Sequence, residues 1–592
     1  MLPPKGVTAR HRSAVLLSVL ITSAVALPAH AQPAPAQPAP PPPAPPPAQP
    51  APPPAPGQGA PPSAAPPAAG PTTAPLAVPE APPAPPPAGS GKQSAASPPA
   101  PPKAFADEAA LAVRDSSSGE PVAGWHNMFF IRDPDGQFRL SPTGDIQLDF
   151  NSWFGKNVDS VPTVNGGAGL HPRFFARRIR FGMHGEFLKR WTFLANFDVT
   201  SPLSNPVGTD EVSAAPPGVD PTADTARFRA VQGVDGGIGM REAWINYSLC
   251  PCLNVEFGQF RPPISQENRT ADWSTPLLER SLAVRTFIVP ANREAGLMLW
   301  GDFGDDVFTY EVAVTGGDGQ NRFTVDASPD FIGRLLVAPL KGVKLIENAR
   351  IGISARHGQR DQENVGYDVV PISTQQGWVL WNSTYADSRG NRVHIIPSGA
   401  QNVIGGELLV PVGPVDIAAE GYYAAYHTRE ALDGFALTNT ERLGTLSGVG
   451  LTSWVDWWAF GDERIGAPVG RMKPQKLNLR KKAEYKRGLQ LTALFSAILG
   501  SYDGNSRGGI DDAATPGSAG NPATDIDAFQ FGLGANYWHT RSVRLALNYN
   551  LFFTPGSGGR ENLAVVPGNI VEPTDADANL LHELGTRVQL AY

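Results

Sequence analysis

Three consecutive segments, Arg178-Ile-Arg-Phe-Gly-Met-His-Gly-Glu-Phe187, Leu188-Lys189-Arg190 and Trp191-Thr-Phe-Leu-Ala-Asn-Phe-Asp-Val199, decide the fold. In the first and third segments apolar residues alternate with polar ones, and only Leu194 breaks the alternation. Because side chains of a β-strand point alternately to opposite faces, the pattern predicts two strands, each with one apolar and one polar face. The tripeptide between them is short enough to predict a hairpin.

The same alternation recurs along most of the chain. It predicts sixteen strands, near residues 145–155, 174–187, 191–199, 240–249, 253–260, 293–303, 307–315, 329–340, 346–356, 401–411, 415–426, 444–459, 487–499, 528–538, 543–553 and 580–592. A turn sequence, Asp133-Pro134-Asp135-Gly136, precedes the first of them.

The connections between these strands alternate in length. Short turns are predicted at residues 188–190, 250–252, 304–306, 411–414 and 539–542, and long loops at 200–239, 261–292, 357–400, 500–527 and 554–579. An even strand number with short turns at one end and long loops at the other is typical of outer-membrane barrels. We therefore predict an all-β fold, a transmembrane antiparallel β-barrel of about 16 strands with short periplasmic turns and long external loops. One segment, 460–486, lies on the short-turn side although it is long and basic.

The N-terminus predicts export. Basic residues precede an apolar run at 14–27, and Ala29-His30-Ala31 matches a cleavage site, so residues 1–31 are predicted to be a signal peptide. No later run of 18 apolar residues could form a spanning helix, whereas a closed barrel satisfies its backbone groups in lipid. The chain ends with alternating apolar residues and Tyr592, which resembles the insertion signal of bacterial outer-membrane proteins. The predicted location is the outer membrane of a Gram-negative bacterium.

Residues 32–104 consist mainly of Pro and Ala. Proline disfavours helix and sheet, so this segment is predicted to be a disordered or semi-rigid periplasmic tether. A spacer without a specific ligand is the simpler interpretation, and contact with peptidoglycan or a periplasmic partner is the alternative. Residues 105–130 are predicted to be a connector, and residues 131–592 the barrel.

Composition and motifs argue against several other functions. A net charge of −7 and a pI near 5.9 do not favour nucleic-acid binding. Cys250 and Cys252 match no common zinc pattern, which leaves either two thiols or one local disulfide. The chain contains no G-x-S-x-G, H-E-x-x-H or Walker sequence, so we predict neither an enzyme nor a bound metal or cofactor.

Three motifs resemble the pattern of the phosphate-selective porin O and P family: Gly258-Gln259-Phe260-Arg261-Pro262-Pro263-Ile264-Ser265-Gln266-Glu267, Leu278-Glu279-Arg280-Ser281 and Asn292-Arg293-Glu294-Ala295-Gly296. The similarity covers roughly residues 130–592. The resemblance implies a homotrimeric porin of 16 strands in contact with outer-membrane lipids. It also implies that loops folded into the lumen carry cationic side chains and pass phosphate or other small anions.

Strand parity predicts which charges face the lumen. If the apolar face contacts lipid, the inward arginines are Arg178, Arg180, Arg334, Arg350, Arg356, Arg544 and Arg587. The inward carboxylates are Asp149, Glu186, Asp198, Glu242, Glu256, Glu311, Asp416 and Glu420. Such a mixed wall does not by itself select anions, and any one wall arginine can serve a structural ion pair. Selectivity is therefore expected at a constriction.

The segment 261–292 supplies the candidate constriction. It contains Arg261, Arg269, Arg280 and Arg285, and rings of arginine at a narrowing select anions. Acidic neighbours of these arginines leave a second interpretation, in which ion pairs hold the loop against the wall. The most probable solute is phosphate or polyphosphate. A general or weakly selective porin, and a barrel that chiefly tethers the envelope, remain the alternatives.

Aromatic residues gather near several predicted strand ends. Trp454, Trp457, Trp458, Phe460, Tyr422, Tyr423 and Tyr426 are predicted to form part of the interfacial aromatic girdle. A track for stacking sugars in the lumen is the alternative.

Overall fold

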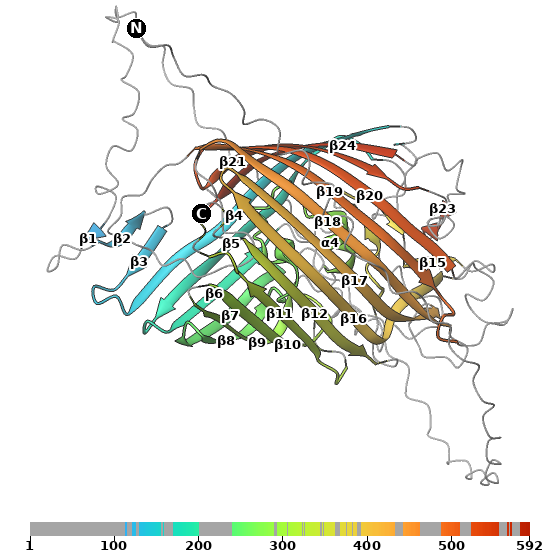
Figure 1. Ribbon diagram of the computed structural model, residues 1–592, viewed down its shortest axis with the longest axis horizontal. Helices are drawn as coiled ribbons and strands as arrows, with labels where there is room; N and C mark the ends of the chain where they lie inside the picture. Colours follow the sequence, from blue (N-terminus) through green and yellow to red (C-terminus); the bar gives the residue numbers. More distant parts are fainter. Residues whose placement is uncertain are drawn as a thin grey trace, which may run out of the picture. The chain divides into compact units, whose positions relative to one another are not determined.

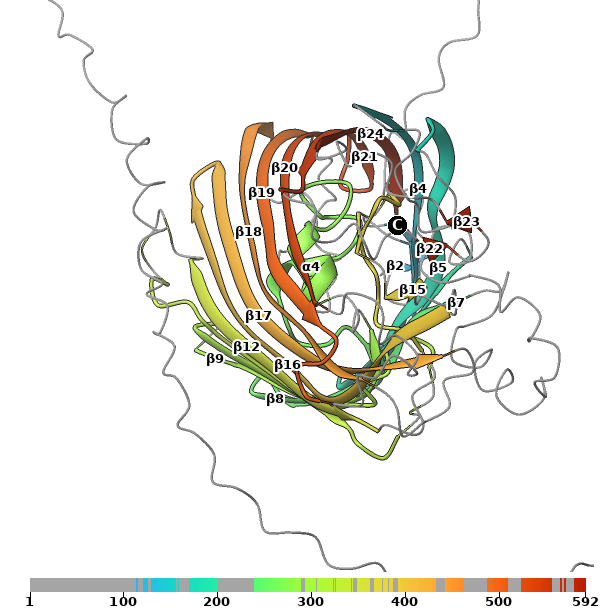
Figure 2. The ribbon, with the colours of Figure 1, turned by 90° about the vertical axis from the view of Figure 1, so that its right-hand side faces the viewer.

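The fold is a single antiparallel sheet that closes on itself. The computed structural model describes residues 113–114, 121–125, 129–155, 158, 170–199, 239–288, 293–304, 306–322, 324, 326–341, 343, 346, 349–361, 367–374, 376–381, 383–386, 392–432, 442–461, 487–508, 523–555, 565–566, 569–570 and 580–592. Sixteen consecutive strands pair with their neighbours, and the last pairs with the first, Ala591 opposite Asp145 (Figures 1 and 2). The predicted barrel of 16 strands is confirmed.

The barrel strands in chain order are β4 (Phe138–Phe154), β5 (Arg173–Phe187), β6 (Trp191–Asp198), β7 (Gly239–Cys250), β8 (Leu253–Phe260), β9 (Glu294–Phe303), β10 (Phe308–Thr315), β11 (Asp330–Val337), β12 (Arg350–Arg360), β16 (Arg392–Val412), β17 (Val415–Leu432), β18 (Leu443–Gly461), β19 (Gly488–Asp503), β20 (Ala523–Trp538), β21 (Val543–Phe553) and β24 (Leu580–Ala591). Each predicted strand overlaps one of them. The remaining elements are β1 (Val113–Arg114), β2 (Pro121–Trp125), β3 (Phe129–Arg132), α3 (Gln266–Arg269), α4 (Leu282–Phe287), β13 (Ile372–Ser373), β14 (Val379–Trp381), β15 (Thr384–Ala386), β22 (Val565–Val566) and β23 (Asn569–Ile570). None of the described helices has the length and apolar character needed to cross a bilayer.

Among the strands that begin earlier than the sequence pattern predicts, β4 and β16 have the longest extensions. In β4, Pro142 is a residue type that favours a turn. Here β4 pairs with β5 on one side, and its other edge is open because the last residue, Tyr592, bonds to Gly144. An open edge tolerates a residue that has no N–H group. In β16, Gly399 also reads as a turn residue. It has a φ of 91° and sits at a shift of register against β17, so the strand passes through a bulge and continues.

A small meander precedes the barrel. β1, β2 and β3 pair in succession, and β3 pairs with β4 through Ile131 and Leu140. The predicted turn at 133–136 joins β3 to β4, with the Gly136 amide donating to the Asp133 carbonyl over 3.2 Å. Strands therefore occur within the segment predicted as a connector.

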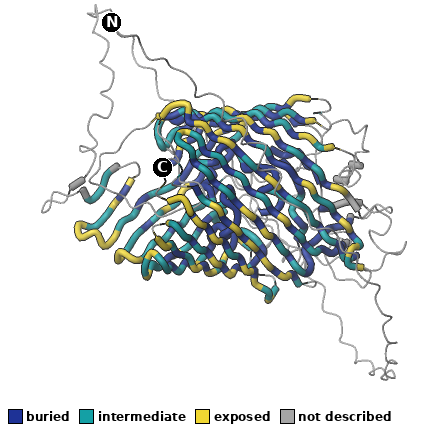
Figure 3. The backbone as a smooth tube through the Cα atoms, in the orientation of Figure 1, coloured by how far each residue is buried: buried dark blue, intermediate teal, exposed yellow. Residues whose placement is uncertain are grey.

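The two faces of the barrel differ as the alternation predicts. On β4, Leu148 is 50% exposed on the outer face, whereas its neighbour Asp149 is 3% exposed on the inner face. Buried and exposed positions alternate in the same way along the other strands (Figure 3). Leu194, which breaks the pattern in β6, is buried on the inner face.

The turns at the periplasmic end are short, as predicted. In the β5–β6 turn, Leu188 and Lys189 have φ values of 52° and 60°, the left-handed conformation that favours tight hairpins. In the β7–β8 turn, Cys250 and Cys252 form a disulfide, which decides between the two states left open by the sequence. The basic segment 462–486 lies outside the described residues.

The predicted aromatic girdle is only partly correct. Trp457, Phe460 and Tyr423 are about half exposed on the outer face. In contrast, Trp454, Trp458, Tyr422 and Tyr426 are buried on the inner face, because neighbouring residues of β17 and β18 alternate in direction. These four belong to the lumen.

A charge on the outer face tests the lipid-facing assignment. Leu547 lies near the middle of β21 and is 48% exposed. We expect Leu547→Arg to lower the free energy of unfolding by about 2–4 kcal/mol, because an arginine at the midplane must leave water for lipid. The shape-conserving control Leu547→Met should cost less than about 1.5 kcal/mol. Guanidinium chloride unfolding of the liposome-reconstituted barrel measures both, and equal effects would contradict the assignment.

Candidate functional site

The connection between β8 and β9 folds into the barrel. Its described residues, 261–288, are almost all buried, and α4 lies against the inner faces of β18 and β19 (Figure 2). We call residues 261–293 the inserted loop. The structure thus places the candidate constriction segment inside the barrel.

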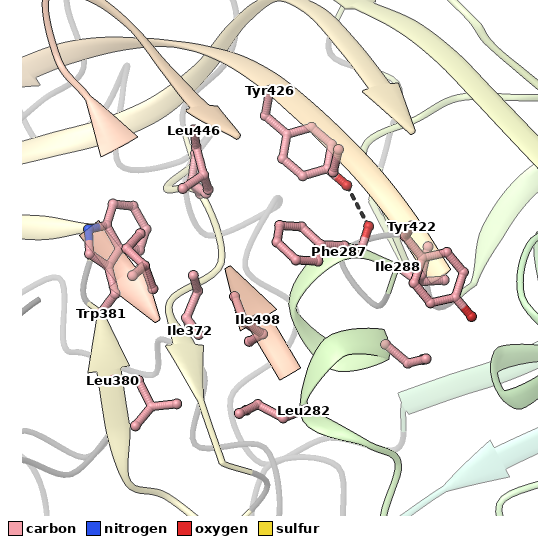
Figure 4. Close-up of a cluster of buried hydrophobic side chains, with 14 of the residues drawn as sticks. Leu282, Phe287, Ile288, Ile372, Leu380, Trp381, Tyr422, Tyr426, Leu446 and Ile498 are labelled. Atoms are coloured by element: carbon pink, nitrogen blue, oxygen red, sulfur yellow. Dashed lines mark hydrogen bonds between the residues drawn. The ribbon is translucent and has the colours of Figure 1, made fainter. Parts of the chain in front are cut away.

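Side chains of β17, β19 and β20 form hydrogen bonds with backbone groups of the inserted loop. The amides of Leu282 and Ala283, which open α4, donate to Gln530 over 2.9 Å and Ser496 over 3.0 Å. The Tyr426 hydroxyl donates to the carbonyl of Phe287 over 2.5 Å at the other end of α4 (Figure 4). The terminal groups of such a short helix have no partner within it, so these wall side chains fix its position.

Apolar contacts hold the same loop on the wall. Leu277 packs into a cluster with Leu494 and Trp454. Gly448 and Gly450 on β18 face the ring of Phe287, and a Cβ at either position would come within 3.0 Å of it. Glycine at these wall positions therefore makes room for α4.

A second segment also enters the lumen. Residues 367–381 follow β12, and β13 contacts α4 while β14 contacts β20. Trp381 is fully buried, with its ring 5.6 Å from that of Tyr502 on β19 (Figure 4). Together, the two inserted segments form an apolar core beside β16–β21.

The other side of the inserted loop is charged. Its Asp272 has six arginines within 4.0 Å: Arg178, Arg180, Arg241, Arg261, Arg280 and Arg293. Its Glu279 pairs with Arg177 at 2.9 Å, Arg178 at 2.8 Å and Arg587 at 2.7 Å. The loop therefore places its own carboxylates among arginines of β5, β7 and β24.

We call this network the arginine cluster. Its members are Arg177, Arg178, Arg180, Arg241, Arg261, Arg280, Arg293 and Arg587, with Asp145, Asp149, Asp198, Glu242, Asp272 and Glu279. The eight arginines exceed the six carboxylates by two charges. The cluster as a whole, formed by wall and loop together, therefore carries an excess of positive charge.

Arginines stabilise the ionised forms of two inserted-loop carboxylates, Asp272 and Glu279. Burial alone would raise the pKa of Asp272, but the guanidinium groups of Arg280 and Arg261 hold that pKa well below its usual value. Burial opposes ionisation of Glu279 in the same way, and Arg177 and Arg178 hold its pKa well below the usual value. Both carboxylates thus remain available to neutralise arginines at neutral pH.

Two arginines of the cluster keep N–H groups without an acceptor. Arg241 donates to Gln320 over 3.1 Å and to Asp272 over 3.4 Å, but its buried Nε has no partner among the described residues. Arg293 uses Nε and Nη2 on Glu242, and its buried Nη1 likewise has no described partner. Buried N–H groups normally have acceptors, so these two donors are the candidate contacts for an anion.

The four predicted constriction arginines differ in their contacts. Arg261 and Arg280 bind Asp272 and loop carbonyls, including that of Thr270. Arg269 donates to the Arg261 carbonyl over 2.6 Å and to Glu311 over 3.0 Å. Arg285 is half-buried and is the one of the four that forms no ion pair with a described carboxylate. Its Nε donates to the Ser373 carbonyl over 3.4 Å.

The predicted wall arginines all face the lumen. Arg178 and Arg180 belong to the arginine cluster. Arg334 pairs with Glu407 at 2.6 Å and Arg356 with Asp330 at 2.5 Å, while Arg350 begins β12 on its inner face. The sequence prediction missed Arg241 because the register between β6 and β7 shifts near Phe197, where the alternation of faces is interrupted. It missed Arg293 because this residue precedes β9, outside the alternating strand.

The chain matches one protein family and has weak similarity to solved outer-membrane structures. Residues 146–482 match the family described as phosphate-selective porin O and P. In vitro folded OmpT, an outer membrane protein of Vibrio cholerae, is 8% identical with a TM-score of 0.41, over 77% of this chain and 98% of that one. The outer membrane channel DcaP of Acinetobacter baumannii is 11% identical with a TM-score of 0.38, over 77% and 97%. No curated protein matches the chain.

Removing one charge at the centre of the cluster tests its role in holding the loop. We expect Asp272→Asn to lower the free energy of unfolding by about 3–5 kcal/mol, because buried arginines lose their shared carboxylate. The same chemical change at Glu186, which pairs with Arg139 near the periplasmic end and is 30% exposed, should cost at most about 1 kcal/mol. Guanidinium chloride unfolding of both variants is the measurement. Equal small losses would show that the cluster does not anchor the loop.

Proposed function

The chain belongs to the phosphate-selective porin O and P family, and we propose that it is an outer-membrane porin through which small anions, chiefly phosphate or polyphosphate, diffuse passively. The family match and the closed barrel establish the coarser statement, a porin of the bacterial outer membrane. Selectivity for anions is what we propose in addition to that statement.

One observation carries the choice of an anion. The arginine cluster holds two more arginines than carboxylates, and Nε of Arg241 and Nη1 of Arg293 lack acceptors among the described residues. In a confined site of low dielectric constant, an uncompensated guanidinium attracts anions more strongly than it would in water. An oxyanion can accept hydrogen bonds from both groups, as phosphate does from arginine in other proteins.

The proposed mechanism is diffusion through a weak site. Guanidinium N–H groups replace part of the hydration shell of the entering anion, which lowers the barrier to entry. Asp272 and Glu242 already bind the same arginines, so they compete with the solute and keep its binding weak. Weak binding allows release down the concentration gradient.

The four arginines of the inserted loop take different parts in this proposal. Arg261, Arg269 and Arg280 hold the shape of the loop, because their donors are largely used by loop carbonyls and carboxylates. Arg285 contributes its charge to the pathway, since it is half-buried and pairs with no described carboxylate.

A general porin is the alternative, favoured by one observation. The inner faces of β10, β16, β17 and β18 carry the buried carboxylates Glu311, Glu407, Asp416 and Asp456. Arg334 pairs with Glu311 at 3.1 Å and with Glu407 at 2.6 Å. A lumen acidic on that side could let cations pass as well.

We also infer the cellular setting from the sequence and the family. Residues 1–31 direct export and are removed, and the mature barrel contacts outer-membrane lipid through its apolar outer face. The assembly is proposed to be a homotrimer, as the family resemblance implies.

Loss of the unsatisfied donor tests anion selectivity. We expect Arg241→Gln to shift the reversal potential under a KCl gradient toward zero and to weaken phosphate block about tenfold, because a charged hydrogen bond is lost. Lys189→Gln removes the same charge from an exposed turn outside the lumen and should change neither value. Planar-bilayer recordings measure both quantities. A reversal potential of cation sign in the unmodified protein would favour the general porin.

The Pro/Ala segment has a separate test. We propose that residues 32–104 act as a periplasmic tether, chiefly a spacer. Deletion of residues 33–102 should leave single-channel conductance unchanged but reduce co-sedimentation of the porin with peptidoglycan if the segment also contacts it. Replacement by a Gly/Ser linker of equal length separates reach from composition. Unchanged co-sedimentation after deletion would remove peptidoglycan contact from the proposal.

A further inference from the structure

A cavity separate from the arginine cluster lies between the two inserted segments. It is open to solvent on one side, and no member of the arginine cluster lines it. Its walls come from Thr286 of α4, from residues 317–322 and 367–372, and from the inner faces of β12, β16, β17 and β18.

One side of this cavity is apolar. Val369, Ile372 and Leu446 line it, together with the ring of Tyr426 (Figure 4). The Tyr426 hydroxyl is engaged by the carbonyl of Phe287, so this residue offers the cavity mainly its ring. An apolar group of a ligand would lose contact with water here.

The other side presents a positioned guanidinium. Arg356 is held by Asp330 over 2.5 Å through Nε, and by Glu294 over 3.2 Å and the Gly317 carbonyl over 3.3 Å through Nη2. Its Nη1 makes no hydrogen bond with any residue that the structure describes. The side chain is only 6% exposed, so this donor is fixed and available to a ligand in the cavity.

The remaining polar groups are mostly committed to each other. The Tyr367 hydroxyl donates to Asp318 over 2.8 Å, and the guanidinium of Arg322 stacks on the Tyr367 ring at 4.3 Å. Asp368 lies 2.9 Å from the His394 ring nitrogen Nδ1. Because these carboxylates balance the arginines, the cavity has no large excess of positive charge, and a compact dianion gains little there.

We propose that this cavity binds an organic monocarboxylate. The carboxylate accepts a hydrogen bond from Nη1 of Arg356, and the apolar body covers Ile372, Leu446 and the ring of Tyr426. Gln401 supplies a further contact, since its Nε2 is used on the carbonyls of Gly399 and His427 while its Oε1 accepts from no described residue. The inference does not rest on anion conduction, because it concerns equilibrium binding at a different place.

Titration calorimetry of the purified full-length protein in detergent tests the ligand class. Benzoate serves as the probe, benzyl alcohol as the same apolar body without the charge, and inorganic phosphate as the charge without the body. We expect benzoate to bind at least about tenfold more tightly than benzyl alcohol, and excess phosphate not to displace it. Equal affinity for benzoate and benzyl alcohol, or displacement by phosphate, would overturn the proposal.

A pair of substitutions on one strand tests the location. Leu446→Trp fills the cavity from β18 and should weaken benzoate binding at least about tenfold. Leu451→Trp on the same strand faces outward, 44% exposed, and should leave binding unchanged. Arg356→Lys keeps the charge but loses the Nη1 donor, and should also weaken binding. Heat-modified electrophoretic mobility verifies folding, and full benzoate affinity in Leu446→Trp would refute the assignment of the site.

Discussion

Backbone hydrogen bonding in lipid is the constraint on which this structure depends. A strand inside a bilayer finds no water, so every edge must be paired, and pairing of β24 with β4 removes the last edge. The same seam is joined inside the barrel, where Arg587 of β24 binds Asp149 of β4 at 2.7 Å and Glu279 of the inserted loop at 2.7 Å. Closure of the wall and placement of the loop thus share one arginine.

Closure with sixteen strands creates a second requirement. The side chains of such a wide wall do not meet across the lumen, so an empty barrel would be a water-filled channel. This chain fills one side by turning two connections inward, and the wall is adapted to them. Gly448 and Gly450 leave space for Phe287, while Gln530 and Ser496 accept from the first amides of α4.

The fold could be predicted from the sequence because the alternation of residues is local. The partners of charges could not, because pairing joins residues far apart in the chain, such as Arg587 and Asp149, 438 positions apart. The apolar and polar pattern also cannot tell the two faces apart where both carry aromatic residues: Trp457 faces outward and its neighbour Trp458 faces inward. The motifs of the inserted loop suggested that it enters the lumen. They could not show that Arg261 and Arg280 donate hydrogen bonds to loop carbonyls, because those bonds depend on the path of the loop backbone.

These pairings bear on what an arginine-rich porin can select. A guanidinium has five N–H donors, and each donor given to a carbonyl or carboxylate of the protein is withdrawn from the solute. Arg280 gives its donors to Asp272 and to three loop carbonyls, so its charge shapes the loop more than it contacts an anion. Arg241 and Arg293 each retain one donor that no described residue accepts from. Selectivity in such a lumen therefore depends on the donors left after the loop is held, and counting arginines overestimates it.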